Sequence, residues 1–119
     1  MKRILIVEDN EDNYYLISFI LGQNGYEVMG ARTGLKGVEL AIKEIPDLIL
    51  MDIQLPDING LEATKLIRSS EANGDIPIIA LTSYAMPGDK REALVAGCTG
   101  YIEKPIDPET ILMTIQKFL

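Results

Sequence analysis

Three short runs of continuously apolar residues constrain the fold of this 119-residue chain more than any other feature. They lie at 4–7, 48–51 and 78–81. Continuous apolar runs are typical of parallel strands that helices cover on both faces. Weaker segments at 27–29 and 100–102 predict two edge strands. Because segments with helical periodicity alternate with these strands, the sequence predicts an α/β fold.

Two of the expected helices have clear ends. Thr33 is a suitable N-cap and Pro46 a suitable stop for a helix whose apolar positions recur at helical spacing: Leu35, Val38, Ile42 and Ile45. The last helix begins at Asp107 and Pro108, a cap followed by proline in the first helical position. Its apolar side comprises Ile111, Leu112, Ile115 and Phe118. We expect both helices to pack on the sheet.

Composition excludes several classes of function. The net charge of −7 disfavours direct binding to nucleic acid or to an anionic membrane. The chain has no histidine, which excludes Ser/His/Asp and Cys/His catalysis and any internal phosphohistidine. Cys98 is the only cysteine, so no internal disulfide or zinc cluster is expected. Without a signal segment or an apolar run of membrane-spanning length, the chain is expected to be one cytoplasmic domain over residues 1–119.

Polar residues stand directly after each core strand. They are Glu8, Asp9, Asp52, Thr82, Ser83 and Lys104. The carboxyl ends of parallel strands share one edge of the sheet, where ligands bind. If the first and third strands are neighbours, Glu8, Asp9 and Asp52 converge, and their carboxylates repel one another unless a cation lies among them. Oxygen ligands without His or Cys favour Mg²⁺, with Mn²⁺ as an alternative.

This arrangement suits phosphoryl transfer. The carboxylate of Asp52 can attack phosphorus and form an aspartyl phosphate, with the metal neutralising charge. Lys104 can pair with Asp52 before the reaction and with a phosphoryl oxygen afterwards, while Thr82 offers a hydroxyl to another oxygen. Because the chain has no histidine of its own, the phosphoryl donor must come from outside.

These motifs resemble the response-regulator receiver domain over essentially the whole chain. The matching segments are residues 7–10 and 50–56, Gly60, Leu81 with Thr82, and Lys104 with Pro105. Residues 7–10 and the loop at 84–89 look similar to those of single-domain regulators of the DivK type and of hybrid-kinase receivers. The resemblance implies a (βα)5 flavodoxin-like fold, a five-stranded parallel sheet in the order 2-1-3-4-5 with helices on both faces.

The resemblance also implies a role for each site residue. Asp52 matches the phosphoacceptor, Asp9 a direct metal ligand, and Glu8 a ligand that acts through water. Gln54 matches a ligand that acts through its backbone carbonyl. The switch residues of the family correspond to Thr82, Tyr101 and Lys104. Two positions depart from the usual pattern, because many relatives have two aspartates where this chain has Glu8 and Asp9, and often alanine at Ser83.

The expected function is a two-component signalling switch rather than a metabolic enzyme. A sensor histidine kinase or a histidine phosphotransfer protein would supply the phosphoryl group, and the domain would catalyse its own phosphorylation and dephosphorylation. Phosphorylation would draw Thr82 inward, let Tyr101 rotate into the vacated space, and change the surface that a downstream protein partner binds. The loop at 84–88 could accommodate this movement.

Three alternatives differ in recognisable features. A magnesium-dependent phosphohydrolase would have a second acid where this chain has Gln54, and it would need a substrate cap. A flavodoxin-like cofactor binder would need a glycine-containing phosphate loop, whereas residues 8–12 are acidic and lack glycine. A degenerate receiver that acts only as a scaffold would lack some of the residues needed for phosphoryl transfer.

Overall fold

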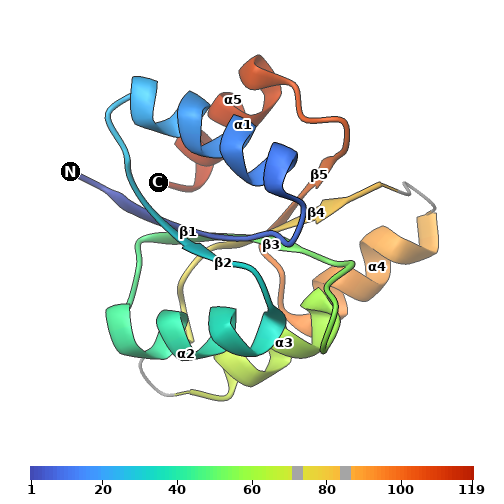
Figure 1. Ribbon diagram of the computed structural model, residues 1–119. Helices are drawn as coiled ribbons and strands as arrows, with labels where there is room; N and C mark the ends of the chain where they lie inside the picture. Colours follow the sequence, from blue (N-terminus) through green and yellow to red (C-terminus); the bar gives the residue numbers. More distant parts are fainter. Residues whose placement is uncertain (71–73, 84–86) are drawn as a thin grey trace.

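The computed structural model describes residues 1–70, 74–83 and 87–119 and has three layers, with one sheet between two groups of helices (Figure 1). The strands are β1 (Arg3–Val7), β2 (Glu27–Ala31), β3 (Leu48–Asp52), β4 (Ile78–Thr82) and β5 (Gly100–Glu103). All pair in parallel, in the order β2-β1-β3-β4-β5. The expected fold class and strand order are confirmed, and β2 and β5 are the edge strands.

Helices cover both faces of the sheet, α1 and α5 on one and α2, α3 and α4 on the other (Figure 1). Their bounds are α1 (Glu11–Gln23), α2 (Gly34–Glu44), α3 (Gly60–Arg68), α4 (Pro87–Ala96) and α5 (Pro108–Phe118). The predicted caps are confirmed, because Thr33 accepts a hydrogen bond from the Lys36 amide and Asp107 accepts one from the Thr110 amide.

The core has two halves that the strands separate. Side chains alternate along β1, so that Ile4 and Ile6 pack under α1 and α5, whereas Leu5 and Val7 face the other three helices. The two halves together bury β1, β3 and β4 on both faces, which explains why their sequences are continuously apolar. On α5 the predicted apolar side is also confirmed, with Ile111 and Ile115 fully buried.

The predicted apolar side of α2 is wrong in three of its four positions. Leu35, Ile42 and Ile45 are 57%, 44% and 51% exposed. The residues that α2 buries are the small ones, Gly34, Gly37 and Ala41. The reason is close packing, because a Cβ at Gly37 would lie only 2.7 Å from Cγ2 of Val7. The helix therefore rests on the sheet through glycine, and Leu35 and Ile42 extend outward.

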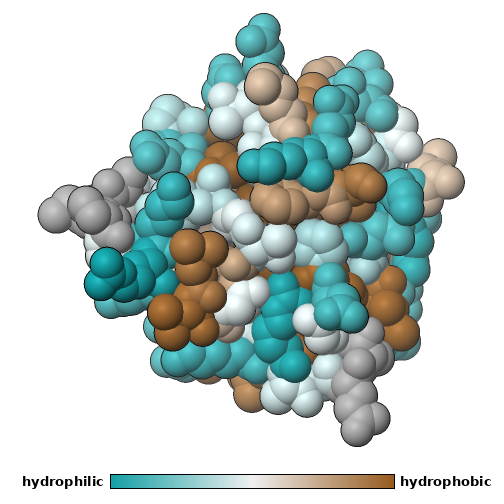
Figure 2. Space-filling view, turned by 180° about the vertical axis from the view of Figure 1, so that it is seen from behind, coloured by the Kyte–Doolittle hydropathy of each residue, from teal (hydrophilic) through white to brown (hydrophobic). Residues whose placement is uncertain are grey.

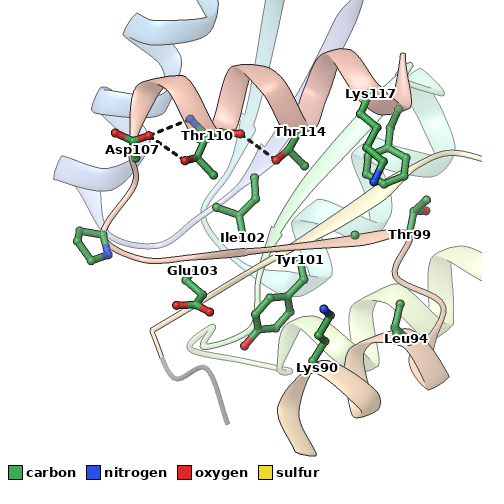
Figure 3. Close-up of a pocket in the computed structure, with 13 residues that line it drawn as sticks. Lys90, Leu94, Thr99, Tyr101, Ile102, Glu103, Asp107, Thr110, Thr114 and Lys117 are labelled. Atoms are coloured by element: carbon green, nitrogen blue, oxygen red, sulfur yellow. Dashed lines mark hydrogen bonds between the residues drawn. The ribbon is translucent and has the colours of Figure 1, made fainter. Parts of the chain in front are cut away.

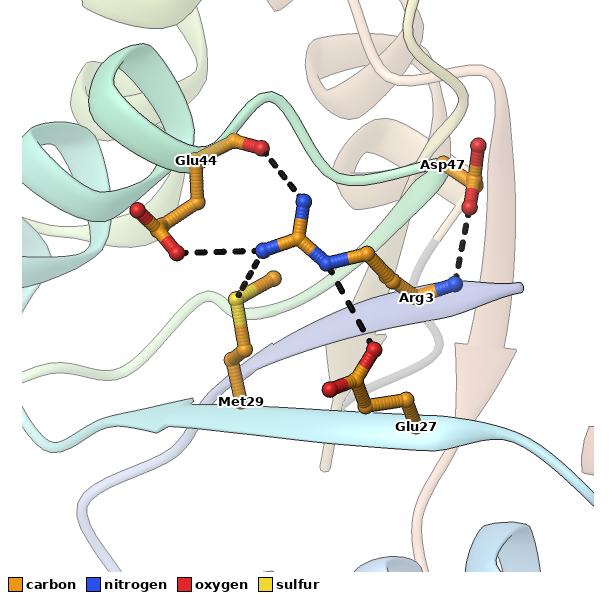
Figure 4. Close-up of polar contacts among 5 residues, drawn as sticks. All are labelled: Arg3, Glu27, Met29, Glu44 and Asp47. Carbon is orange, nitrogen blue, oxygen red and sulfur yellow. Dashed lines mark hydrogen bonds and ion pairs between the residues drawn. The ribbon is translucent and has the colours of Figure 1, made fainter. Parts of the chain in front are cut away.

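A cluster around Arg3 closes the end of the sheet where β1 begins (Figure 4). Its guanidinium donates to the Glu44 carbonyl at 2.8 Å and to Glu44 Oε1 at 3.1 Å. It also contacts Met29 Sδ at 3.3 Å and Glu27 Oε2 at 3.7 Å. The Arg3 backbone amide donates to Asp47 Oδ2 at 2.7 Å. These contacts join β1 and β2 to the segment between α2 and β3.

The exposed apolar side chains form small groups. Figure 2 shows several of them, separated by polar residues, on the side of the molecule turned away in Figure 1. The larger exposed apolar residues of the helices include Tyr15, Leu16 and Phe19 on α1 and Leu94 and Val95 on α4. Within the described ranges, none of the helices combines the length and the apolar character that a membrane crossing requires.

We expect Gly37→Ala to destabilise the fold and Gly22→Ala to stabilise it slightly. The new methyl group at position 37 would meet the stiff, buried side chain of Val7, which costs about 1–3 kcal/mol. Position 22 on α1 has nothing within 4 Å, so alanine there should add about 0.5 kcal/mol through its helix propensity. Urea unfolding of both variants measures the difference, and equal effects would contradict the close packing of α2.

Candidate functional site

The polar residues predicted to share one edge of the sheet do so. The register pairs Val7 with Met51, which places Glu8 beside Asp52 at the carboxyl ends of β1 and β3. Glu8, Asp9 and Asp52 each offer one carboxylate oxygen within 4.8 Å of the other two. The expected convergence of the three carboxylates is therefore confirmed.

Lys104 joins this group from the end of β5, and we call the four residues Glu8, Asp9, Asp52 and Lys104 the carboxylate site. Its ammonium lies 2.8 Å from Glu8 Oε1 and 3.2 Å from Asp52 Oδ1. The Glu8 side chain is completely buried and Asp52 is 2% exposed, whereas Asp9 is exposed. One ammonium thus pairs with two buried carboxylates, and the exposed Asp9 carboxylate lies close to both of them.

The electrostatics of the site follow from this imbalance. Burial, together with the hydrogen bond and negative charge of Glu8, raises the pKa of Asp52 to about 7. Burial also opposes ionisation of Glu8, but its hydrogen bond with Asp52 and the positive charge of Lys104 outweigh that effect and lower the pKa of Glu8. The Lys104 pKa is raised, because the two carboxylates outweigh burial. At neutral pH the two acids therefore compete for one cation.

A divalent metal fits this donor set. All the donors are hard oxygens, and Glu8 Oε1 receives no well-formed hydrogen bond among the described residues although Lys104 lies beside it. Asp9 is exposed and leaves one side open to water. Buried carboxylates with a solvent-facing side match the way proteins hold Mg²⁺, which keeps several of its waters.

The loop that follows β3 is fixed to Asp52 by backbone contacts. The Gln54 amide donates to Asp52 Oδ1 at 3.2 Å, and the Gly60 amide donates to the Ile53 carbonyl at 2.8 Å. A Cβ at position 60 would collide with the Asp52 carbonyl oxygen. Glycine at this position therefore permits the close approach of the loop to the end of β3. The metal-binding role of the Gln54 carbonyl stays a prediction.

One loop residue escaped the sequence analysis. Asp57 accepts hydrogen bonds from the Gly34 and Leu35 amides at the start of α2. An isolated acid in a loop has no local signal that identifies such a contact, because its partners lie more than twenty residues away in the sequence.

The two proposed switch residues lie on the same face of the sheet. Tyr101 pairs with Ala80, two residues before Thr82 on β4, so its side chain points to the same side as that of Thr82. Thr82 is buried and lines a cavity of about 140 Å³ together with Gln54. The half-buried Tyr101 ring points into a groove of about 660 Å³ along β5, between α4 and α5 (Figure 3). Residues 84–86 of the loop expected to move lie outside the described residues.

We expect the metal-free protein to lose stability as the pH rises from about 5 to about 7, and to lose little more above that. The pKa of Asp52 is about 7 in the folded chain against an ordinary 3.8, so the folded state binds this proton more tightly than the unfolded state. The protonated Asp52 therefore stabilises the fold fully below pH 3.8, its ordinary pKa. This stabilisation is lost as the pH rises to about 7, its pKa in the folded chain. Because the chain has no histidine, Asp52 should dominate this range.

Chemical denaturation followed by circular dichroism measures this dependence. Asp52→Asn is the control and should remove the slope. Mg²⁺ should restore stability to the wild-type protein at the upper end of the range, because it binds only the folded site. An equal slope in the two proteins would contradict the assignment to Asp52.

Known proteins share both the sequence pattern and the fold. The family model of the response regulator receiver domain matches residues 4–116. The polar-differentiation response regulator DivK of Brucella ovis is 45% identical over 118 residues, which cover 99% of this chain and 96% of the relative. In the described part of the chain, the strand order and the edge at which the carboxylates converge are those expected from this family.

Two solved structures superpose closely. The chemotaxis protein CheY4 of Vibrio cholerae has a TM-score of 0.96 at 34% identity, covering 100% of this chain and 99% of the other. The receiver domain of the sensor histidine kinase PA1611 of Pseudomonas aeruginosa, which has a magnesium ion coordinated in its active-site cleft, has a TM-score of 0.92 at 38% identity, covering 98% and 96%. The chain therefore belongs to the response regulator receiver domain family, whose members accept phosphoryl groups in two-component signalling.

Proposed function

We propose that this receiver accepts a phosphoryl group on Asp52 in a magnesium-dependent reaction and reports it to a protein partner. The observation that supports this most strongly is the Lys104 ammonium between the buried carboxylates of Glu8 and Asp52. Such a site has an excess of negative charge that a divalent cation can balance. The donor is a sensor histidine kinase or a histidine phosphotransfer protein, as is usual for the family.

Four groups would hold the metal. Asp9 and Asp52 would bind it through their carboxylates, Glu8 would act through an intervening water, and Gln54 would contribute its backbone carbonyl. The magnesium ion in the active-site cleft of the PA1611 receiver supports Mg²⁺ as the metal, and the same oxygen ligands would accept Mn²⁺. When bound, the metal supplies the positive charge that lets a phosphoryl group approach these carboxylates.

The residues of the chain itself carry out the transfer. A carboxylate oxygen of Asp52 forms a bond to phosphorus while the bond from phosphorus to the donor atom breaks, and the leaving group takes the electron pair. Lys104 then pairs with a phosphoryl oxygen, and the Thr82 hydroxyl donates to another. Hydrolysis of the acyl phosphate by water returns Asp52 to its carboxylate form. The domain in this way catalyses both its phosphorylation and its dephosphorylation.

Signal output depends on Thr82 and Tyr101. When Thr82 moves toward the phosphoryl oxygens, it leaves space on its own face of the sheet. Tyr101 lies on that face, opposite Ala80, which comes two residues before Thr82. Rotation of Tyr101 into this space reshapes the groove between α4 and α5 that its ring now lines. The partner is a protein that binds this surface, and residues 1–119 act as one receiver domain.

Incubation with acetyl phosphate should give a single phosphoryl adduct on the wild-type protein, and only when Mg²⁺ is present. Asp52→Asn should give none, because the amide cannot act as the nucleophile. Intact mass measurement detects the adduct, and circular dichroism verifies that the variant is folded. A folded, metal-loaded wild type that forms no adduct would contradict the proposed function and favour a scaffold.

Thr82→Ala should separate phosphorylation from the switch. The variant keeps Asp52 and Lys104, so the adduct should still form, whereas the hydroxyl that couples the phosphoryl group to Tyr101 is missing. Hydrogen exchange at residues 100–104 should change on phosphorylation in the wild type and stay nearly constant in the variant. Equal changes in both proteins would show that Thr82 does not transmit the signal.

A further inference from the structure

The Asp57 carboxylate spans the gap between the loop after β3 and the start of α2. Its Oδ1 accepts a hydrogen bond from the Gly34 amide at 2.8 Å, and its Oδ2 accepts one from the Leu35 amide at 2.9 Å. These amides belong to the first turn of α2, where no carbonyl within the helix can accept them. A carboxylate at this end of a helix is also favoured by the helix dipole.

The close contact between this loop and α2 depends on the absence of a side chain at Gly34. A Cβ there would lie 2.6 Å from Ile58 Cγ1 and 2.9 Å from the Ile58 carbonyl oxygen. The backbone of the loop therefore lies directly against the first turn of α2, and Asp57 is the polar part of that contact. The two amide hydrogen bonds also lower the pKa of Asp57, which keeps it ionised at neutral pH.

The other end of the same loop contacts the carboxylate site. The Gln54 amide donates to Asp52 Oδ1, and the Gly60 amide closes the loop on the Ile53 carbonyl. Residues 53–59 are thus fixed at their inner end to Asp52 and at their outer end to α2. Because α2 rests tightly on β1 through Gly37, it gives the outer end a firm support.

We propose that Asp57 is a positioning residue for the metal site, which it serves by anchoring loop 53–59 to α2. The anchor keeps the Gln54 backbone in place, with its amide on Asp52, and so holds the carbonyl that is proposed above as a metal ligand. This inference rests on the proposed function, since it assumes that the site binds Mg²⁺. Residues that orient metal ligands from outside typically contribute tenfold or more to metal affinity.

Titration calorimetry with Mg²⁺, above the Asp52 pKa of about 7, tests the proposal. We expect Asp57→Ala to bind Mg²⁺ about tenfold more weakly than the wild type. Asp57→Asn keeps one acceptor oxygen, so its affinity for Mg²⁺ should fall between those of the wild type and Asp57→Ala. Phosphorylation by acetyl phosphate should need correspondingly more Mg²⁺ in Asp57→Ala, and saturating Mg²⁺ should return its rate close to that of the wild type.

Thr33→Ala is the matched control. It removes the other cap of α2, the hydrogen bond from the Lys36 amide to Thr33 Oγ1, without touching the loop. Thr33→Ala should keep wild-type affinity even though α2 loses stability. An equal loss of Mg²⁺ affinity in Thr33→Ala and Asp57→Ala would overturn the proposal, because the lower affinity would then follow from destabilisation of α2 alone.

Two further outcomes are separable. Wild-type affinity in Asp57→Ala would overturn the positioning role and leave the proposed function standing. If the wild type itself bound no Mg²⁺, the proposed function would fail first. Should Asp57→Ala not fold, the Asp57→Asn variant decides, and undiminished affinity in it would overturn the proposal.

Discussion

The burial of two carboxylates beside a single ammonium is the constraint on which the rest of this structure depends. Glu8 and Asp52 are almost fully removed from water, and Lys104 is their shared ion-pair partner. Burial of unbalanced charge is costly, so such a group persists only where the surrounding fold fixes it firmly. That support comes from three parallel strands with apolar cores on both faces. The fold holds together carboxylates that would otherwise repel one another, and binding of a cation or a proton reduces this repulsion.

The two ends of the sheet differ in how they treat charged side chains. At the end where β1 begins, Arg3 meets Glu27, Glu44 and the sulfur of Met29, so its guanidinium has several partners. At the other end, Glu8 and Asp52 share Lys104, and the Asp9 carboxylate lies close to both acids. The Glu27 and Glu44 carboxylates stay partly exposed, so water stabilises their excess charge, whereas the buried carboxylates beside Lys104 gain stability when they bind a cation. The difference marks the carboxyl end of the strands as the place where ligands act.

Much of the fold and of this site follows from the sequence for physical reasons. Continuously apolar runs can be satisfied only when both faces of a strand are covered, so the strands were predictable. The convergence of Glu8, Asp9 and Asp52 then follows from parallel pairing. The packing side of α2 was not predictable from apolar spacing, because glycines rather than large side chains make its closest contacts. Asp57 gave no signal either, since its contact joins distant segments.

These two failures of prediction have a common origin. Gly37 and Gly34 let α2 approach the sheet and the loop after β3 more closely than any side chain would permit. Close approach of backbones leaves no apolar pattern in the sequence, yet it determines where the first turn of α2 stands. Because Asp57 accepts hydrogen bonds from that turn, the position of α2 helps to fix the loop that contacts Asp52. The glycines of α2 therefore contribute to the geometry of the carboxylate site from outside it, by fixing the support to which its loop is attached.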